Sequence, residues 1–299
     1  MTDKPRAEVD IDELLVRSLL GEQCPELAAL PLTRVAEGWD NEIWRLGDGY
    51  AVRLPRRSAA VALVEHEQQW LGRLAPSLPV PVPVAVVAGR PTERYPWPWS
   101  VVEWHPGEAL GHRPGSARIA DAMGGFLEAL HVPAPADAPP NAVRGVALAD
   151  RREMTERWFA TAETVLDPAE HARLHAAWHA ALAQPTWSRA PVWVHGDLHP
   201  LNLVVDGDEL AAVIDFGDLT SGDPASDLAV AWMAFDPPER ARLQRMLPAV
   251  DPATWRRAHG WAVALGVAIL ANADDTPDLA RMARAILARV LDGAPIVAD

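Results

Sequence analysis

Two short segments, VHGDLHPLNLVV (194–205) and VIDFGD (213–218), concentrate ionisable residues at the edges of apolar runs. The residues between them predict a β-hairpin whose turn lies at Asp206-Gly207. Since hairpin strands run back on each other, the residue before the first strand and the residue after the second lie at the same end. Asn202 and Asp215 are therefore expected to lie close together, with Asp197 in the loop that leads into the hairpin.

This spacing has a chemical use. Two carboxylates and an amide oxygen suit Mg²⁺, which proteins usually share with substrate phosphates. An aspartate, an asparagine five residues later and an Asp-Phe-Gly after a hairpin form the arrangement that kinases use. Here these residues are Asp197, Asn202 and Asp215-Phe216-Gly217.

The rest of the chain predicts an α+β, bilobal fold. Its first part is β-rich, and the pattern after about residue 116 is mostly helical. The elements expected in the first part are three short strands within 31–55, a helix over 61–75, edge strands and loop in the proline-rich segment 76–99, and a strand that begins at 99. We expect a small N-lobe over residues 1–103, which binds the nucleotide, and a larger C-lobe over 104–299, which holds the catalytic loop and the acceptor-binding helices.

The motifs HGDLHPLN (195–202) and VIDFGDLTSGDPASDLA (213–229) resemble the aminoglycoside phosphotransferase family. This is the antibiotic-kinase branch of the protein-kinase-like fold, and it includes the macrolide phosphotransferases. The order of the lobes, the connector WSVVEWHPGE (99–108) and the helical tail also fit. Either motif alone is weak, but the pair is specific.

The resemblance implies a role for each matching residue. Asp197 would be catalytic, orienting the acceptor hydroxyl and accepting its proton. Asn202 and Asp215 would hold Mg²⁺ on the phosphates of ATP or GTP. The backbone at Glu103 would pair with the edge of the base.

Further residues of the two motifs would support the loop. His195 and Gly196 would shape the catalytic loop, and either Asp223 or Asp227 would brace it.

The chain departs from the kinase pattern on the third strand. Kinases usually have a lysine there, whereas YAVRLP offers Arg53. Arginine is permanently charged and binds phosphate in a bidentate way, but it is not equivalent to lysine. The macrolide phosphotransferases are similar here, since they also have arginine. Its expected partner is Glu67, with Glu65 as the alternative.

The segment expected to cover the phosphates is EGWDN (37–41) rather than G-x-G-x-x-G. Gly38 and Asn41 would let backbone amides approach phosphate, and Trp39 is expected to contact the ligand. The sequence contains no Walker-type G-x-x-x-x-G-K-[ST] motif.

The composition limits the classes of molecule that the protein is expected to bind. A net charge of −14 argues against nucleic acid, which needs a basic surface. The charge is compatible with a cationic small-molecule acceptor, or it only keeps the protein soluble.

The longest apolar stretch, 261–273, is shorter than a membrane span and predicts a buried helix. A single cysteine, Cys24, excludes an intrachain disulfide framework, and we expect a cytoplasmic protein. The sequence does not indicate an oligomeric state.

Some residues have two interpretations. His195 and His199 would share a metal if they lay on one helix, as in a metallohydrolase, but Pro200 disfavours a helix there. Trp158 and Trp232 would line an acceptor pocket or, more simply, belong to the core. A further polar cluster is expected to form a solvated loop between the last two helices: Asn272, Asp274, Asp275 and Asp278.

The sequence thus predicts an ATP- or GTP-dependent O-phosphotransferase that moves the γ-phosphate to a hydroxyl of a small molecule. The resemblance makes an aminoglycoside or a macrolide the best guess. A metabolite kinase with a choline-, homoserine- or sugar-type acceptor is one alternative. A kinase-like module that binds nucleotide without turnover is another, and only Arg53 in place of lysine favours it.

Overall fold

The computed structural model describes residues 6–273 and 276–293. The N-terminal part is built on a five-stranded antiparallel sheet with the strand order β1-β2-β3-β5-β4. Its strands are β1 (Leu32–Glu37), β2 (Asn41–Leu46), β3 (Tyr50–Pro55), β4 (Ala85–Gly89) and β5 (Trp99–Glu103). The three strands expected within 31–55 are confirmed. The proline-rich segment supplies only the edge strand β4, because proline cannot donate the hydrogen bonds of a central strand.

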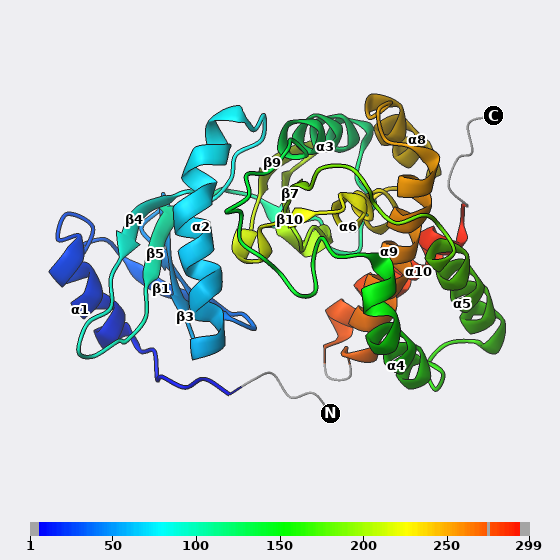
Figure 1. Ribbon diagram of the computed structural model, residues 1–299. Helices are drawn as coiled ribbons and strands as arrows, with labels where there is room; N and C mark the ends of the chain where they lie inside the picture. The colour runs from blue at the N-terminus through cyan, green and yellow to red at the C-terminus, as the bar shows by residue number, and fades with distance from the viewer. Residues whose placement is uncertain (1–5, 274–275, 294–299) are drawn as a thin grey trace.

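Two helices flank this sheet: α1 (Glu13–Gln23) and α2 (Val61–Leu74). Helix α1 begins at Asp12, whose side chain accepts a hydrogen bond from the Leu15 amide at 2.8 Å. Figure 1 shows α1 at the outer end of the molecule and α2 between the sheet and the helical part. Trp70 and Leu71 of α2 belong to the core of the helical part. Helix α2 thereby ties the sheet to the rest of the molecule.

The C-terminal part is mostly helical, as expected. Its helices are α3 (Ala117–Leu130), α4 (Arg152–Ala162), α5 (Pro168–Leu182), α6 (Ala225–Leu228), α7 (Val230–Met233), α8 (Pro237–Met246), α9 (Pro252–Ala271) and α10 (Pro277–Leu291). Helix α9 is buried along most of its length and packs against α5 and α10. The buried helix expected from 261–273 is therefore confirmed. In the described ranges, no helix is both long and apolar enough to cross a membrane.

Two small sheets lie between the helices. Strands β8 (Leu203–Asp206) and β9 (Glu209–Val213) form the expected hairpin, with its turn at Gly207-Asp208 instead of Asp206-Gly207, and β6 (Glu108–Ala109) adds to its edge. The second sheet pairs β7 (Val192–Val194) with β10 (Thr220–Gly222). Strands β7 and β8 hold the two ends of the first polar motif (194–205), and β9 and β10 flank the second (213–218). The α+β, bilobal architecture is that of the kinase-like fold, whereas the division at residue 103 stays a prediction.

Candidate active site

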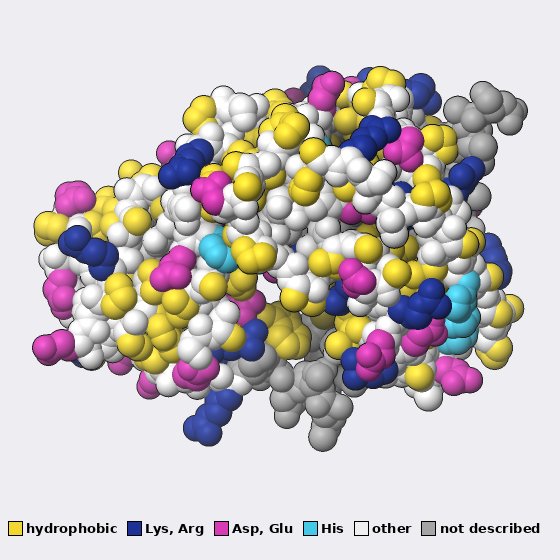
Figure 2. All heavy atoms as spheres, in the orientation of Figure 1, with side chains coloured by type: hydrophobic (Ala, Val, Ile, Leu, Met, Phe, Trp, Pro, Cys, Tyr) yellow, Lys and Arg dark blue, Asp and Glu magenta, His cyan; other side chains and the backbone are white. Residues whose placement is uncertain are grey.

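A cavity of about 940 Å³ lies between the N-terminal sheet and the helical part. Figure 2 shows the surface hollowed between the two parts of the molecule. The cavity is lined by every residue that the sequence proposed for chemistry or nucleotide contact, namely Gly38, Asn41, Arg53, Glu67, Glu103, Asp197, Asn202 and Asp215. The fold thus brings together residues that lie far apart in the sequence, while their individual roles stay predictions.

The hairpin joins the two motifs through hydrogen bonds. Leu203 pairs with Val213 in the register of β8 and β9. Just beyond that pair, the Ile214 amide donates to the Asn202 carbonyl at 3.0 Å. The Asn202 side-chain amide donates to the Asp197 carbonyl at 2.8 Å. The amide nitrogen of Asn202 is thus used within the loop, and its oxygen is the atom suited to a cation.

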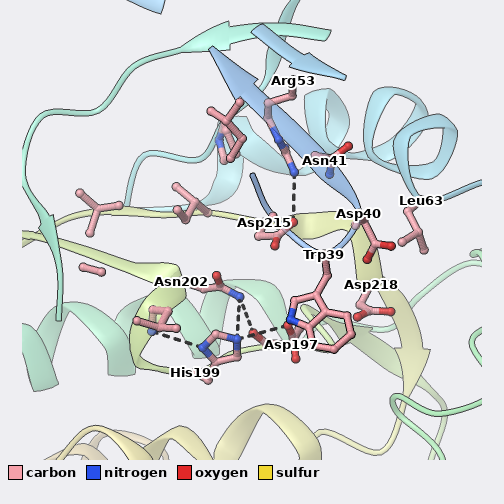
Figure 3. Close-up of a pocket in the computed structure, with 18 of the residues that line it drawn as sticks. Trp39, Asp40, Asn41, Arg53, Leu63, Asp197, His199, Asn202, Asp215 and Asp218 are labelled. Carbon is pink, nitrogen blue, oxygen red and sulfur yellow. Dashed lines mark hydrogen bonds and ion pairs between the residues drawn. The ribbon is translucent and has the colours of Figure 1, made fainter. Parts of the chain in front are cut away.

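Asp215 has a left-handed backbone conformation, with φ 66° and ψ 65°. Among the described residues it is the only non-glycine residue with a positive φ. Aspartate is one of the few residues that tolerate this region. The conformation ends the strand sharply, and the half-exposed side chain accepts a hydrogen bond from Arg53 at 3.0 Å (Figure 3).

The loop that carries Asp197 is braced by Asp227. Its carboxylate, which is fully buried, accepts hydrogen bonds from the amides of His195 (2.7 Å) and Gly196 (3.0 Å). Gly196 has φ 87°, and a Cβ there would lie 2.4 Å from the Asp218 carbonyl oxygen. The loop therefore requires glycine at this position. The other motif aspartate, Asp223, instead pairs with the buried Arg257 at 2.8 Å.

Two side chains, Arg144 and His199, flank Asp197. Arg144 donates to its carboxylate at 2.6 Å, and His199 Nε2 lies 3.3 Å from it. Burial raises the pKa of Asp197, but His199 and Arg144 outweigh that effect and hold the pKa well below its ordinary value. Asp197 is therefore ionised at neutral pH and can accept a hydrogen bond from a hydroxyl. Arg144 belongs to no motif of the sequence, since it lies in an irregular segment more than fifty residues before Asp197.

Arg53 contacts two carboxylates from different elements. It donates to Glu67 on α2 and, at 3.0 Å, to Asp215. Burial lowers the pKa of Arg53, but the two carboxylates raise it above its ordinary value, so the guanidinium stays charged. Glu67 is buried and Glu65 is exposed. Of the two partners considered, the structure therefore brings Glu67 to Arg53.

The segment between β1 and β2 turns tightly over the cavity. The Gly38 amide donates to the Asn41 carbonyl at 2.8 Å, and Arg56 donates to the Gly38 carbonyl at 2.9 Å. Trp39, at the tip, is 48% exposed and lines the cavity. Glu103, at the end of β5, also lines the cavity. Backbone and aromatic groups thus frame this end of the cavity.

The helical wall of the cavity is mostly apolar. Its residues come from α4, α7, α9 and α10, and they are Trp158, Met233, Leu265, Ala268, Ile269, Asn272, Leu279 and Met282, with Arg151 beside them. Trp232 is fully buried in the core. Asp278 is exposed and pairs with Arg281, but it lies in the first turn of α10 rather than in the loop expected for it. Asp274 and Asp275, of the same cluster, lie outside the described residues.

The two histidines of the first motif have separate partners. His195 is buried, its ring packs on Phe216 with centroids 4.4 Å apart, and its Nε2 lies 3.0 Å from the Ile214 carbonyl. His199 instead contacts Asp197. The arrangement supports a structural His195 and gives no support to the metallohydrolase alternative.

Comparisons with known proteins identify the family and the fold of the chain. The model of a family described as the phosphotransferase enzyme family matches residues 31–261. The chain therefore belongs to the phosphotransferase enzyme family, and its class is that of a small-molecule phosphotransferase.

Similar solved structures span nearly the whole chain. The GDP complex of aminoglycoside 2'-phosphotransferase-IIIa has a TM-score of 0.70 and 17% identity, covering 94% of this chain and 99% of that chain. The macrolide 2'-phosphotransferase of Brachybacterium faecium has a TM-score of 0.60 and 21% identity, covering 92% and 96%. The ternary complex of streptomycin, ATP and APH(2")-IIa has a TM-score of 0.59 and 17% identity, covering 87% and 91%. At these identities the likeness establishes the fold.

Proposed function

We propose that the protein transfers the γ-phosphoryl group of ATP or GTP to a hydroxyl of a small, largely apolar molecule. The observation that carries the proposal is the meeting of Asp197, Asn202 and Asp215 on one cavity, opposite Arg53. Similar structures that contain GDP or ATP support a nucleotide in the sheet-side half of the cavity. The tight turn at Gly38, with Trp39 at its tip, and the backbone at Glu103 would contact its phosphates and base.

The metal requirement follows from the donor set. The Asn202 amide oxygen and the Asp215 carboxylate would hold Mg²⁺, which supplies neutralisation of the phosphate charge when bound. Arg53 would bind the phosphates as well, and its contact with the Asp215 carboxylate supports this role.

Asp197 would position the acceptor. Its ionised carboxylate accepts a hydrogen bond from the acceptor hydroxyl and receives the proton as the new oxygen–phosphorus bond forms. At the same time the bond between the γ-phosphorus and the oxygen that bridges it to the β-phosphorus breaks. Phosphoryl transfer has a loose transition state, so orientation matters more than a strong base. The lowered pKa of Asp197 suits that role.

The acceptor class is indicated by the helical wall. Its described residues are apolar except for Asn272 and Arg151, and the pocket has room for a bulky ligand. Such a wall favours apolar surface, and the guanidinium of Arg151 disfavours a polycation. A macrolide-type acceptor therefore fits better than an aminoglycoside, and the net charge of the chain is compatible with a cationic acceptor without requiring one.

Turnover on a panel of acceptors tests both the phosphoryl transfer and the proposed acceptor class. The pure protein is incubated with Mg²⁺, ATP or GTP, and macrolides, aminoglycosides, choline, homoserine or sugars, beside Asp197→Asn. We expect acceptor-dependent nucleoside diphosphate release with wild type, fastest with a macrolide. Preference for an aminoglycoside would overturn the acceptor class alone. Nucleotide binding without turnover on any acceptor would favour the binding module.

A further inference from the structure

A cluster of metal-ligating side chains lies outside the cavity, on the surface formed by α4 and α5. Glu156 of α4 and His175 and His179 of α5 each offer one ligand atom, and these atoms lie within 4.8 Å of one another. We propose that these three residues form a binding site for a divalent transition metal ion, with Zn²⁺ as its best representative.

The sequence of α5 creates the pair of imidazoles. His171, His175 and His179 are spaced four residues apart, which brings them onto one face of a helix. The His175 and His179 rings lie with centroids 4.4 Å apart. Two histidines at this spacing are a known way to hold zinc on a helix. Figure 2 shows histidine side chains gathered on the surface over α5, beside an acidic one.

Glu156 supplies a third ligand from the neighbouring helix. One carboxylate oxygen lies 2.9 Å from His175 Nε2 and the other lies 3.6 Å from His179 Nε2. The buried Trp178 donates to the same carboxylate through its indole nitrogen at 3.0 Å. A hydrogen bond of this kind orients a metal ligand before the ion arrives.

The neighbouring residues determine which histidines of α5 belong to the proposed metal site. Phe159 packs edge-on against His175, with ring centroids 5.0 Å apart. His171 Nε2 is instead 3.2 Å from the Phe159 carbonyl oxygen, so that nitrogen is already engaged with the backbone. His171 is therefore outside the proposed ligand set and provides a matched control on the same helix face.

The donor atoms select the ion. Two imidazole nitrogens and one carboxylate oxygen suit Zn²⁺, Ni²⁺ or Cu²⁺, whereas Mg²⁺ and Ca²⁺ prefer oxygen ligands. The three side chains are between a third and a half exposed, so the site is open to ions and to a water as fourth ligand. A bound ion would cross-link α4 to α5 and stabilise the folded protein by mass action.

The site is separate from the phosphotransferase cavity. None of its three residues lines that cavity, and its preferred ions differ from the Mg²⁺ proposed there. Its test is accordingly independent of catalytic activity.

Calorimetric titration with Zn²⁺ tests the proposal. The protein is untagged and kept in excess Mg²⁺, so that the oxygen ligands of the cavity are occupied. We expect one equivalent of Zn²⁺ to bind and the midpoint of thermal unfolding to rise. The double variant His175→Ala, His179→Ala should lose both effects, whereas His171→Ala and Asp215→Asn should keep them.

Two further measurements make the assignment specific. Glu156→Gln keeps an acceptor for Trp178 but removes the charge, and we expect it to weaken Zn²⁺ binding about tenfold or more. Co²⁺ in place of Zn²⁺ should give visible absorption in wild type and none in the double histidine variant. Absence of binding in wild type at about a tenfold excess of Zn²⁺ over protein, or undiminished binding in the folded double variant, would overturn the proposal.

Discussion

The two ends of the cavity are built in different ways. At the end where the motifs meet, the charged side chains of Arg53, Asp215, Asp197 and Arg144 are held by hydrogen bonds and ion pairs. At the other end the helices present apolar side chains that are held by packing. Directional contacts fix reacting atoms, whereas packing selects a shape. Changes at the first end should therefore lower kcat, and changes at the second should raise KM for the acceptor.

Asp197→Ala should have the largest effect. Loss of the group that orients and deprotonates the hydroxyl should lower kcat by roughly a thousandfold, while the affinity for nucleotide stays near that of wild type. Steady-state kinetics and nucleotide titration measure the two quantities. Asp206→Ala, at the exposed end of β8 beside the hairpin turn, is the matched control and should keep full activity. If Asp197→Ala keeps the turnover of wild type, the catalytic role given to Asp197 is contradicted.

Arg53→Ala should combine a kinetic and a structural loss. The phosphate contact disappears, and Glu67 is left buried without its cation, which costs about 3 kcal/mol of stability. We expect kcat/KM to fall roughly a hundredfold, by analogy with the loss of one charge-stabilising group. Arg53→Lys should recover part of both losses, as measured by urea unfolding and kinetics. An unchanged stability of the alanine variant would show that the pair with Glu67 is not formed in solution.

Asp227→Ala tests the brace of the catalytic loop. Two buried amides would lose their acceptor, and the free energy of unfolding should fall by about 3 kcal/mol. Because the loop carries Asp197, kcat should fall more than the KM for nucleotide rises. Equilibrium unfolding in urea and steady-state kinetics separate these effects. A stable variant with normal kcat would mean that the loop holds its shape without the carboxylate.

Ile269→Ala probes the apolar end of the cavity. Removal of this half-buried side chain takes away apolar contact with the acceptor, which costs about 1.5 kcal/mol. We expect KM for a macrolide to rise roughly tenfold, with kcat and the KM for nucleotide unchanged. Leu14→Ala, at an exposed position on α1, controls for the loss of apolar surface as such. A fall in kcat instead would contradict the separate roles given to the polar and the apolar end of the cavity.

The pH dependence of kcat/KM tests the environment of Asp197. Arg144 and His199 lower the pKa of Asp197, so the acid limb of the profile should lie below the ordinary range of an aspartate. Arg144→Met should move that limb to higher pH, whereas Arg151→Met should leave it in place.

Stability should follow the same titration. Because the folded-state pKa of Asp197 is below the unfolded one, the ion pair stabilises the fold at neutral pH, and this contribution is lost as the pH falls from the unfolded value toward the folded one. An acid limb that is the same in Arg144→Met and wild type would contradict the role given to this pair.

Much of the first end was predictable from the sequence. The spacing of Asp197, Asn202 and Asp215 around a hairpin turn defines their meeting, since a hairpin has one simple geometry. Arg53 and Glu67 followed from the resemblance to kinases, which have a cation on the third strand and a glutamate on the helix after it. Arg144 was not predictable, because it lies in an irregular segment whose path depends on tertiary packing.

The second end could not be predicted for a different reason. Leu265, Ile269 and Met282 lie on helices whose other apolar residues form the core, and periodicity does not separate a residue that faces a cavity from one that faces the core. Trp158 and Trp232 illustrate this, since the first lines the cavity and the second is fully buried. The brace had a partial signal, because the sequence limited it to Asp223 or Asp227.

The most direct measurement of the central claim is the mass of the acceptor after incubation with Mg²⁺ and nucleotide, for wild type and Asp197→Asn side by side. The oxygen cluster and the apolar wall together predict that a macrolide gains one phosphoryl group in the presence of the wild-type protein alone. An acceptor that stays unmodified in every mixture while the protein binds nucleotide, or one that both proteins modify equally, would contradict the account.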